Sequence, residues 1–349
     1  MTVLHRQRSF LRTGLLLLAA LGILTGASIA DDEAGSARVS AERGLAFLAA
    51  QQHDDGTWNG PAGGYTGVIG TCLLAFLAHG HVPRSGPYGP VLGRAIDHLL
   101  AHQDPDGLLW VHGDAPIYQH GLATLALSEV FGESRDPRLG LALQRAVALI
   151  CRVQNHRGGW RHLPTTQDGD EVASSVVQLM ALRSAHNIGM SVPPEVIDAG
   201  LNYVRRCQTR VINGGDGGFT YSIGSRESNW PRTGAGLSAL MLGGDYHDGG
   251  IREGLEFLMR FTPVGPRAVT EEWYWHFGAW YVTLAFYQAQ GRGAWEADCW
   301  RRFYPAMVSY VTKAQQDSGR WKGSYEPFPT AAHLLVLSFP CNYLPIHQR

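Results

Sequence analysis

The stretch AVALICRVQNHRGGW, residues 146–160, decides the fold. Its apolar residues recur at helical spacing as far as Val153, which predicts an amphipathic helix. Gln154 follows that helix, and a short turn containing Gly158 leads to Trp160. Four other segments repeat this order of helix, glutamine, glycine turn and aromatic residue. They are residues 41–58, 95–110, 201–219 and 307–321, the third of which has phenylalanine in place of tryptophan.

The spacing of the glutamines sets the length of the repeat. Gln52, Gln103, Gln154 and Gln208 are 51, 51 and 54 residues apart, and Gln315 follows after 107 residues. Because the last interval is two repeats long, we expect a degenerate copy in residues 251–261 (IREGLEFLMRF), which lack the glutamine. A fixed period of this length is the signature of a repeat architecture. We therefore predict six repeats, with approximate boundaries 38–90, 91–138, 139–192, 193–245, 246–298 and 299–349.

Each repeat contains a second predicted helix after its aromatic residue. Several of these second helices are apolar on most sides, and a helix that is apolar all round is a buried helix. They cover residues 67–78, 117–131, 172–186, 233–242, 276–290 and 330–339. Alternating amphipathic and buried helices predict two concentric layers. The predicted fold is therefore all-α, a single-domain (α/α)6 toroid over residues 31–349. An open α-solenoid such as a HEAT array is the alternative.

The first 30 residues are expected to be a secretory signal peptide. Arg6, Arg8 and Arg12 precede an uncharged run over residues 14–30, and small residues stand before the expected cleavage site after Ala30. The apolar run is shorter than the roughly 20 residues that span a bilayer comfortably. The sequence therefore predicts an exported protein, periplasmic or extracellular, and an uncleaved anchor is the alternative.

Composition and charge argue against two classes of protein. Hydrophobic residues make up 45% of the chain and the net charge is -1, so the chain is not disordered. With 29 basic and 30 acidic residues, no sequence-wide field attracts phosphate backbones, and we predict no nucleic-acid partner. The five cysteines form no C-x-x-C pair, and a lone histidine is more often a core or surface residue than a ligand. We predict neither a metal nor a cofactor.

The glutamine–tryptophan segments resemble the QW repeats of the terpene cyclase and protein prenyltransferase superfamily. The resemblance covers almost all of residues 31–349, and its motif recurs in register. It implies that each glutamine closes the end of an outer helix and that the aromatic residue packs on it. A glutamine amide suits this task because it offers two donors and two acceptor lone pairs. The sequence looks like an exported bacterial member with a single toroid.

A shorter match follows the turn at Gly158. Residues 168–173, DGDEVA, resemble the D-x-D-D-T-A motif of squalene–hopene-type cyclases, in which the central aspartic acid protonates an alkene. The resemblance implies that Asp170 is a catalytic acid, with Asp168 and Glu171 beside it. Close carboxyl groups raise one another's pKa, which suits an acid. The match is partial, because Glu171 and Val172 replace Asp and Thr. The alternative is that Asp170 is only the N-cap of the following helix.

In a closed ring the inner helices run parallel, so their first turns meet at one mouth. Aromatic residues at helix starts are more often packing residues, but one such residue in each repeat would also make a ligand pocket. Besides Asp170 and Glu171, the substrate-binding candidates at this mouth are Tyr65, Tyr118, His120, Trp230, Arg232, Trp275, His276 and Tyr325.

Three functions stay open at this point. The first is an exported toroid that binds a hydrophobic small molecule, a glycan or a protein at its mouth without catalysis, with peripheral membrane contact as a further option. The second is a lyase or isomerase that acts on a polyprenyl or triterpenoid chain, with Asp170 as the acid. The third is a polysaccharide-active enzyme, because (α/α)6 toroids also carry glycoside hydrolases and lyases with paired carboxylates.

Overall fold

The computed structural model describes residues 35–58, 65–261, 274–323 and 326–348, and the regular secondary structure of these residues is almost all helix. A first helix covers residues 35–50. The further helices are α2 (Thr66–Ala78), α3 (Gly89–Ala101), α4 (Pro116–Ser134), α5 (Pro137–Arg152), α6 (Val172–Asn187), α7 (Pro194–Arg206), α8 (Trp230–Leu242), α9 (Gly249–Met259), α10 (Tyr274–Ala289), α11 (Ala294–Ala314) and α12 (Phe328–Leu337). Two short strands, β1 (Phe219–Thr220) and β2 (Ser228–Asn229), pair antiparallel.

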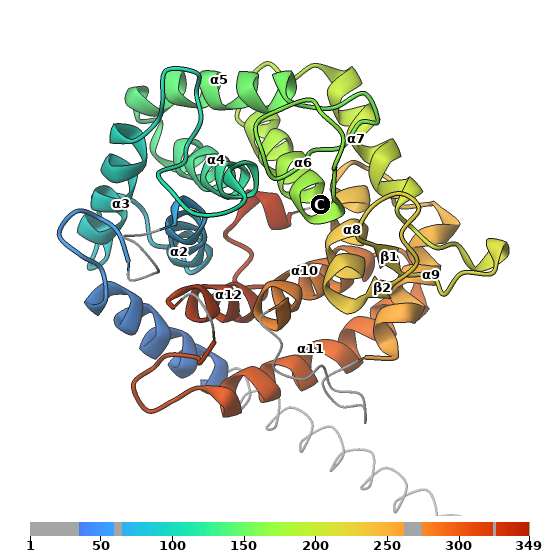
Figure 1. Ribbon diagram of the computed structural model, residues 1–349. Coiled ribbons are helices and arrows are strands. Elements are labelled where there is room, and N and C mark those ends of the chain that lie inside the picture. Colours follow the sequence, from blue (N-terminus) through green and yellow to red (C-terminus); the bar gives the residue numbers. More distant parts are fainter. Residues whose placement is uncertain (1–34, 59–64, 262–273, 324–325, 349) are drawn as a thin grey trace, which may run out of the picture.

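The helices form two concentric rings (Figure 1). The inner ring runs α2, α4, α6, α8, α10 and α12, and α12 packs against α2 again, so the ring is closed. The helix over residues 35–50 and α3, α5, α7, α9 and α11 form the outer ring, and α3 to α11 each pack on the inner helix that precedes them in the chain. This arrangement confirms the predicted all-α toroid, and the alternative of an open solenoid is wrong.

Five glutamines join neighbouring repeats through the same pair of hydrogen bonds. The Nε2 of Gln154 donates to the carbonyl oxygen of Gly158 in its own turn (2.9 Å) and to that of Val196 in α7 (2.9 Å). Gln52, Gln103 and Gln208 bridge to the next outer helix in the same way. The Nε2 of Gln315 donates to Gly319 (2.8 Å) and to Ser40 (2.9 Å), which joins the last repeat to the first.

The glycine of each turn allows this close approach. Gly158 has φ +90°, and a Cβ there would lie 2.2 Å from the carbonyl oxygen of Ala199 in the next outer helix. Turns at Gly56, Gly107, Gly217 and Gly319 have the same positive φ and the same type of contact. Only glycine tolerates this conformation and this lack of space together.

The aromatic residue of the motif closes its own helix. The indole Nε1 atoms of Trp58, Trp160 and Trp321 donate to backbone carbonyls ten residues earlier, at 2.7 to 2.8 Å. The second repeat differs from the sequence assignment. Its glutamine pairs with Leu109, so Leu109 holds the motif position and Trp110 lies one residue beyond it, bonded to the Gly113 carbonyl (3.2 Å).

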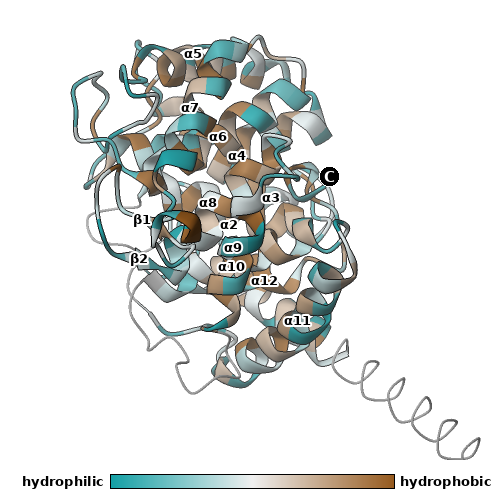
Figure 2. Ribbon diagram, turned by 90° about the vertical axis from the view of Figure 1, so that its right-hand side faces the viewer, coloured by the Kyte–Doolittle hydropathy of each residue, from teal (hydrophilic) through white to brown (hydrophobic). Residues whose placement is uncertain are grey.

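The two ends of the ring differ. The inner helices begin at one end, beside β1 and β2. The C-terminal segment crosses the other end, and Figure 2 shows the C-terminus on the side away from β1 and β2. Leu344, Ile346 and His347 are buried there. The Ile346 amide donates to Oε2 of Glu129 (3.4 Å), and Nε1 of Trp280 donates to Nε2 of His347 (3.1 Å). We call residues 344–347 the C-terminal plug.

Some sequence predictions lie outside the described residues. These are the signal peptide, Tyr325 and the turn after the degenerate fifth repeat. Within the described ranges, no helix is both long and apolar enough to cross a bilayer. The described part of the chain also contains no cluster of three histidine, cysteine or acidic residues arranged to hold a metal ion.

Candidate functional site

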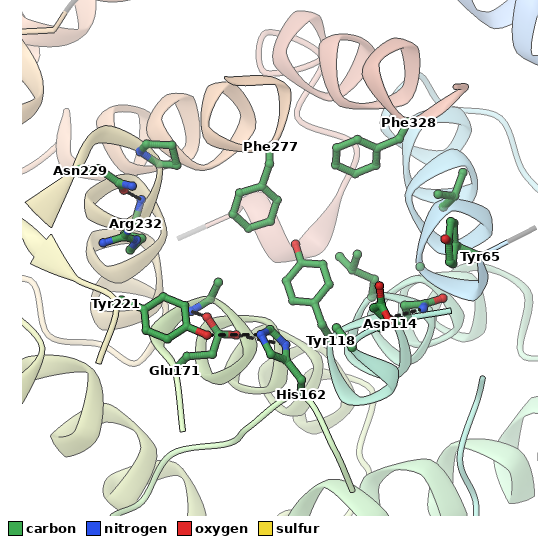
Figure 3. A pocket seen from close by; sticks show the side chains of 17 residues that line it. Tyr65, Asp114, Tyr118, His162, Glu171, Tyr221, Asn229, Arg232, Phe277 and Phe328 are labelled. Atoms are coloured by element: carbon green, nitrogen blue, oxygen red, sulfur yellow. Dashed lines mark hydrogen bonds and ion pairs between the residues drawn. The ribbon is translucent and has the colours of Figure 1, made fainter. Parts of the chain in front are cut away.

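A pocket of about 340 Å³ lies where the inner helices begin (Figure 3). All six inner helices contribute a residue from their N-terminal part or from the position just before it. These residues are Tyr65 (α2), Tyr118 (α4), Glu171 (α6), Asn229 (α8), Phe277 (α10) and Phe328 (α12). The parallel inner helices therefore do bring their N-terminal ends to one mouth, as the repeat pattern indicated.

Most of the pocket lining is apolar. The rings of Tyr118 and Phe277 lie 5.7 Å apart, and Phe328, Leu122 and Val68 extend the same surface. Figure 3 shows the Tyr118 hydroxyl pointing between the aromatic side chains. Burial raises the pKa of Tyr118 well above its ordinary value, so this hydroxyl stays protonated at neutral pH.

One side of the pocket is polar, and we call Glu171, His162, Tyr221, Asn229 and Arg232 the polar wall. Nδ1 of His162 lies 3.3 Å from Oγ of Ser174 and 3.8 Å from Oε1 of Glu171. Nε2 of the same ring lies 3.4 Å from the Tyr221 hydroxyl. Figure 3 shows these side chains in a row along the wall.

Backbone hydrogen bonds hold the two loop residues of the polar wall in place. The carbonyl oxygen of His162 accepts from the amide of Ile117 in α4 (2.9 Å), and that of Tyr221 accepts from the amide of Val172 in α6 (2.8 Å). Both donors are amides of a first helical turn, which have no partner inside their own helix. Each loop is thereby fixed to the neighbouring inner helix.

Arg232 and Asn229 complete the polar wall at the start of α8. The Oδ1 atom of Asn229 accepts from the Arg232 amide (3.0 Å) and so caps the helix. The Arg232 guanidinium donates to the carbonyl of Glu227 (2.8 Å) and lies 5.7 Å from the centre of the Tyr221 ring. Among the described residues, no carboxylate lies within ion-pair distance of Arg232.

The acidic motif is oriented differently from the sequence expectation. The N-cap of α6 is Glu171 and not Asp170, because the Glu171 carboxylate accepts from the amides of Ala173 (3.2 Å) and Ser174 (2.5 Å). Glu171 is extended (φ −142°, ψ 154°), and consecutive side chains of an extended segment point to opposite sides. Glu171 therefore lines the pocket, whereas Asp170 does not.

Asp170 lies behind the wall, and Asp168 lies on the surface. Oδ1 of Asp170 accepts from Nδ2 of Asn155 (2.9 Å) and is 3.5 Å from Nη1 of Arg157, and the side chain is fully buried. Asp168 is exposed beside His156 (3.5 Å). This geometry does not favour Asp170 or Asp168 as groups that reach a ligand in the pocket.

Four other candidates are packing residues in this structure and do not line the pocket. His120 accepts from the amide of Leu109 (3.0 Å) and bonds the Ala146 carbonyl (3.2 Å), so it joins two repeats. Burial lowers its pKa to about 4. The buried rings of Trp230 and Trp275 stack 4.9 Å apart, and His276 packs edge-on against His333.

The sequence reasoning found Tyr65, Tyr118, Glu171 and Arg232 and missed other lining residues. The polar and aromatic ones among these are His162, Tyr221, Asp114, Gln119, Asn229, Phe277 and Phe328. A signal for two of them exists in the repeat itself. His162 and Tyr221 each stand two residues after the motif aromatic residue, Trp160 or Phe219. The other lining residues carry no comparable mark.

Comparison with known proteins places this site in a known fold. No protein-family model matches the chain. The type II terpene cyclase MstE from Scytonema superposes with a TM-score of 0.59 at 18% identity, over 90% of this chain and 99% of that one. An α-1,6-mannanase from Salegentibacter gives 0.67 at 8% identity, covering 87% and 98% of the two chains. The chain is an α/α toroid.

A further solved structure and one curated sequence are also similar to parts of this chain. The toroid superposes on cellobiose 2-epimerase from Bacillus thermoamylovorans with a TM-score of 0.63 at 12% identity, over 88% of this chain and 99% of that one. In sequence, 84 residues are 40% identical to drimenyl diphosphate synthase from Streptomyces showdoensis. That segment is 24% of this chain and 15% of the synthase, so the chain matches only a small part of this relative.

Proposed function

We propose that this toroid binds a small, largely apolar molecule of the isoprenoid type in its pocket, with the polar end of the ligand against the polar wall. The observation that carries the proposal is the lining: six inner helices converge on one pocket whose surface is mainly aromatic and aliphatic, with the polar wall on one side and Asp114 beside Tyr65 on the other. Ligand sites are concave, mostly apolar and fixed by few polar groups.

The size of the pocket and the relatives support the same ligand class. A volume of about 340 Å³ falls within the range of roughly 300–1,000 Å³ for small-molecule sites. MstE is described in complex with geranylgeranyl dihydroxybenzoate, and the matched synthase is named for drimenyl diphosphate. Carried over to this chain, these names suggest a prenyl chain.

This proposal does not use Asp170 as an acid. A catalytic acid must lie within hydrogen-bond reach of the atom that receives its proton. Asp170 is engaged behind the wall by Asn155, and Glu171 accepts amide hydrogen bonds as the cap of α6. A cyclase that starts by protonation would need one of these groups to turn into the pocket.

A polysaccharide-active enzyme is the second candidate. Asp114 and Glu171 both line the pocket, and glycoside hydrolases use two carboxyl groups that flank the sugar. The mannanase, which is described in complex with α-1,6-mannotriose, and the epimerase share the fold. The aromatic rings of Tyr65 and Tyr118 would then stack on sugar faces.

Calorimetry with farnesol and with α-1,6-mannotriose separates the two candidates. We expect farnesol to bind and the sugar not to bind. Truncation of Phe277 to alanine removes a large apolar contact and should weaken farnesol binding about tenfold or more. Tyr343→Ala is the control, because Tyr343 is exposed outside the pocket. Sugar binding that depends on Asp114, without farnesol binding, would contradict the proposal.

We also propose that the chain is exported and cleaved after Ala30. The support is the order of basic residues, apolar run and small residues at the N-terminus. The intact mass of the protein purified from its own host tests this directly. The expected mass lacks the first 30 residues, and the mass of the complete chain would contradict cleavage.

A further inference from the structure

We propose that the polar wall is a general acid–base centre, in which His162, oriented by Glu171, accepts the proton of the Tyr221 hydroxyl beside an anion subsite formed by Arg232 and Asn229. The ligand class is an amphiphile whose polar end is a carboxylate. This inference rests on the proposed function only in that a ligand must occupy the pocket.

The first argument is the convergence of three chemically matched groups from separate segments. Glu171 caps α6, His162 belongs to the loop before it, and Tyr221 comes from the following repeat, 59 residues after His162. Two backbone hydrogen bonds fix the loops that carry the histidine and the tyrosine. The separations of 3.3 to 3.8 Å along the row are loose, as is common in sites without a ligand.

The second argument is the tautomer that this row selects. Nδ1 of His162 faces the Glu171 carboxylate (3.8 Å), which can only accept a hydrogen bond, and Oγ of Ser174 (3.3 Å), which can also accept one. The proton of a neutral imidazole is therefore favoured on Nδ1, which leaves the lone pair of Nε2 facing the Tyr221 hydroxyl. In this arrangement histidine is the base, tyrosine is the proton carrier and Glu171 is a positioning residue.

The third argument is the unpaired cation beside the tyrosine. The Arg232 guanidinium lies over the Tyr221 ring, and no described carboxylate lies within ion-pair distance of it. A guanidinium stabilises both a phenolate and a bound carboxylate. The Oδ1 atom of Asn229 is used in capping α8, so its amide group can donate to the same anion.

The proposed transfer among Tyr221, His162 and the ligand conserves protons. The Tyr221 O–H bond breaks and an N–H bond forms at Nε2 of His162. The phenolate then accepts a proton from the carbon next to the ligand carboxylate, which restores tyrosine. The imidazolium returns its proton to the ligand atom that becomes basic, so the net change is a proton shift within the ligand. No oxidant, reductant or metal is required, and the reaction class is isomerisation.

Nitration by tetranitromethane, located by peptide mass spectrometry, tests the Tyr221–His162 pair without a ligand. The reagent attacks phenolate, and Tyr343 is an internal control because its exposed fraction (57%) is similar to that of Tyr221 (44%). We expect Tyr221 to react about tenfold faster than Tyr343. His162→Gln and Glu171→Gln should reduce this difference to the part that Arg232 causes, whereas His156→Gln, a change in an exposed histidine of the same repeat, should not.

Equal rates at the two tyrosines, or a Tyr221 that reacts as fast in the folded His162→Gln protein as in the unmodified protein, would overturn the acid–base pair. Thermal unfolding of each variant verifies that it is folded. These results do not depend on any ligand, so they stand even if the proposed function fails.

Binding of farnesoic acid and of farnesol tests the anion subsite. The two probes share their chain, and we expect the acid to bind about tenfold more tightly. Arg232→Gln should remove the preference, because it weakens binding of the acid about tenfold more than binding of farnesol. Equal affinity of the unmodified protein for acid and alcohol would overturn the anion subsite alone. Absence of binding by both probes would contradict the proposed function as well.

Discussion

Two neighbouring carboxyl groups show how a single residue step decides access to the pocket. The acidic motif was recognisable in the sequence, but its orientation was not, because the extended backbone at Glu171 directs adjacent side chains to opposite sides. Sequence similarity favoured Asp170, which is buried behind the wall, while Glu171 both caps α6 and lines the pocket. Motif matching cannot detect this, since both residues lie inside the motif.

Paired variants separate the two carboxyl groups. Asp170→Asn weakens the buried contact with Arg157 and should cost about 1–3 kcal/mol of unfolding free energy without changing ligand affinity. Glu171→Gln keeps an oxygen to cap α6 and should cost about 1 kcal/mol or less, yet change ligand affinity. Urea denaturation and calorimetry measure both effects. A changed ligand affinity in Asp170→Asn together with an unchanged affinity in Glu171→Gln would indicate that Asp170 is the acid that faces the ligand.

Glu129 makes stability depend on pH between about 4.5 and 7. Burial raises its pKa from 4.5 to about 7, opposed by the hydrogen bond from Ser184. The folded state therefore holds this proton more tightly, so its stabilisation is complete below pH 4.5 and is lost as pH rises through 7. The loss reaches about 3 kcal/mol, the equivalent of 2.5 pKa units. Urea denaturation between pH 5 and 8.5 should show this loss, and Glu129→Gln should reduce it.

Buried histidines make the stability of the fold depend on pH in the acid range. Burial lowers the pKa of His333 and His347 to about 3 and that of His79 to about 4. The unfolded chain then binds more protons, so stability falls as pH decreases below about 6.5. We expect acid unfolding to begin near pH 5, and circular dichroism during acid titration measures it. A fold that stays intact at pH 3 would show that these rings are accessible when protonated.

At the scale of the helix pair, the glutamine turn was predictable from the sequence. The use of Leu109 at the aromatic position of the second repeat was not. The spacing of the glutamines located five of the joints between outer helices, because each needs an amide at the end of the helix and a glycine four to nine residues later. In the second repeat the aromatic position is taken by Leu109, and His120 bonds the Leu109 amide. In other repeats a hydroxyl oxygen accepts from the amide of the motif aromatic residue, namely that of Ser175, Thr233 or Thr330. The spacing of the repeats does not reveal these partners.

Two glycines with the same φ distinguish conformational strain from lack of space. Gly158 and Gly189 both have φ +90°, but only at Gly158 would a Cβ meet the backbone of a neighbouring helix, 2.2 Å from the Ala199 oxygen. Gly189→Ala should cost about 1–2 kcal/mol through strain alone. Gly158→Ala should cost at least about 3 kcal/mol, because the joint to α7 must open. Similar melting temperatures for the two variants would show that the joint is compliant.

At the scale of the whole molecule, the repeat count predicted a closed ring and the parallel inner helices predicted a mouth. The polar wall could not be predicted, because His162 and Tyr221 come from loops whose positions depend on hydrogen bonds to the neighbouring repeat. The C-terminal plug was also absent from the sequence reasoning. It lies beyond the last repeat motif, and its partners Glu129 and Trp280 are 217 and 67 residues away in the chain.

The plug should be part of the cooperative fold and not of the ligand site. Ile346→Ala removes a fully buried side chain and should cost about 2–4 kcal/mol of unfolding free energy. Gln348→Ala, an exposed neighbour, should change it by about 0.5 kcal/mol or less. Ligand affinity should stay the same in both folded variants, since the pocket opens at the opposite end. A loss of affinity in Ile346→Ala would show that the two ends are coupled.

The pairing of Ser40 with Gln315 has a consequence for biosynthesis. These residues are 275 positions apart, and at about 5–20 residues per second a ribosome needs roughly 15 to 55 seconds to make the intervening chain. During that time the side of the earliest helix at Gly44 lacks its neighbours from the last repeat, Trp321 and Leu334. The nascent polypeptide is thus an incomplete ring with an exposed apolar surface at its first helix. Such a surface favours binding of chaperones until the final repeat has been translated.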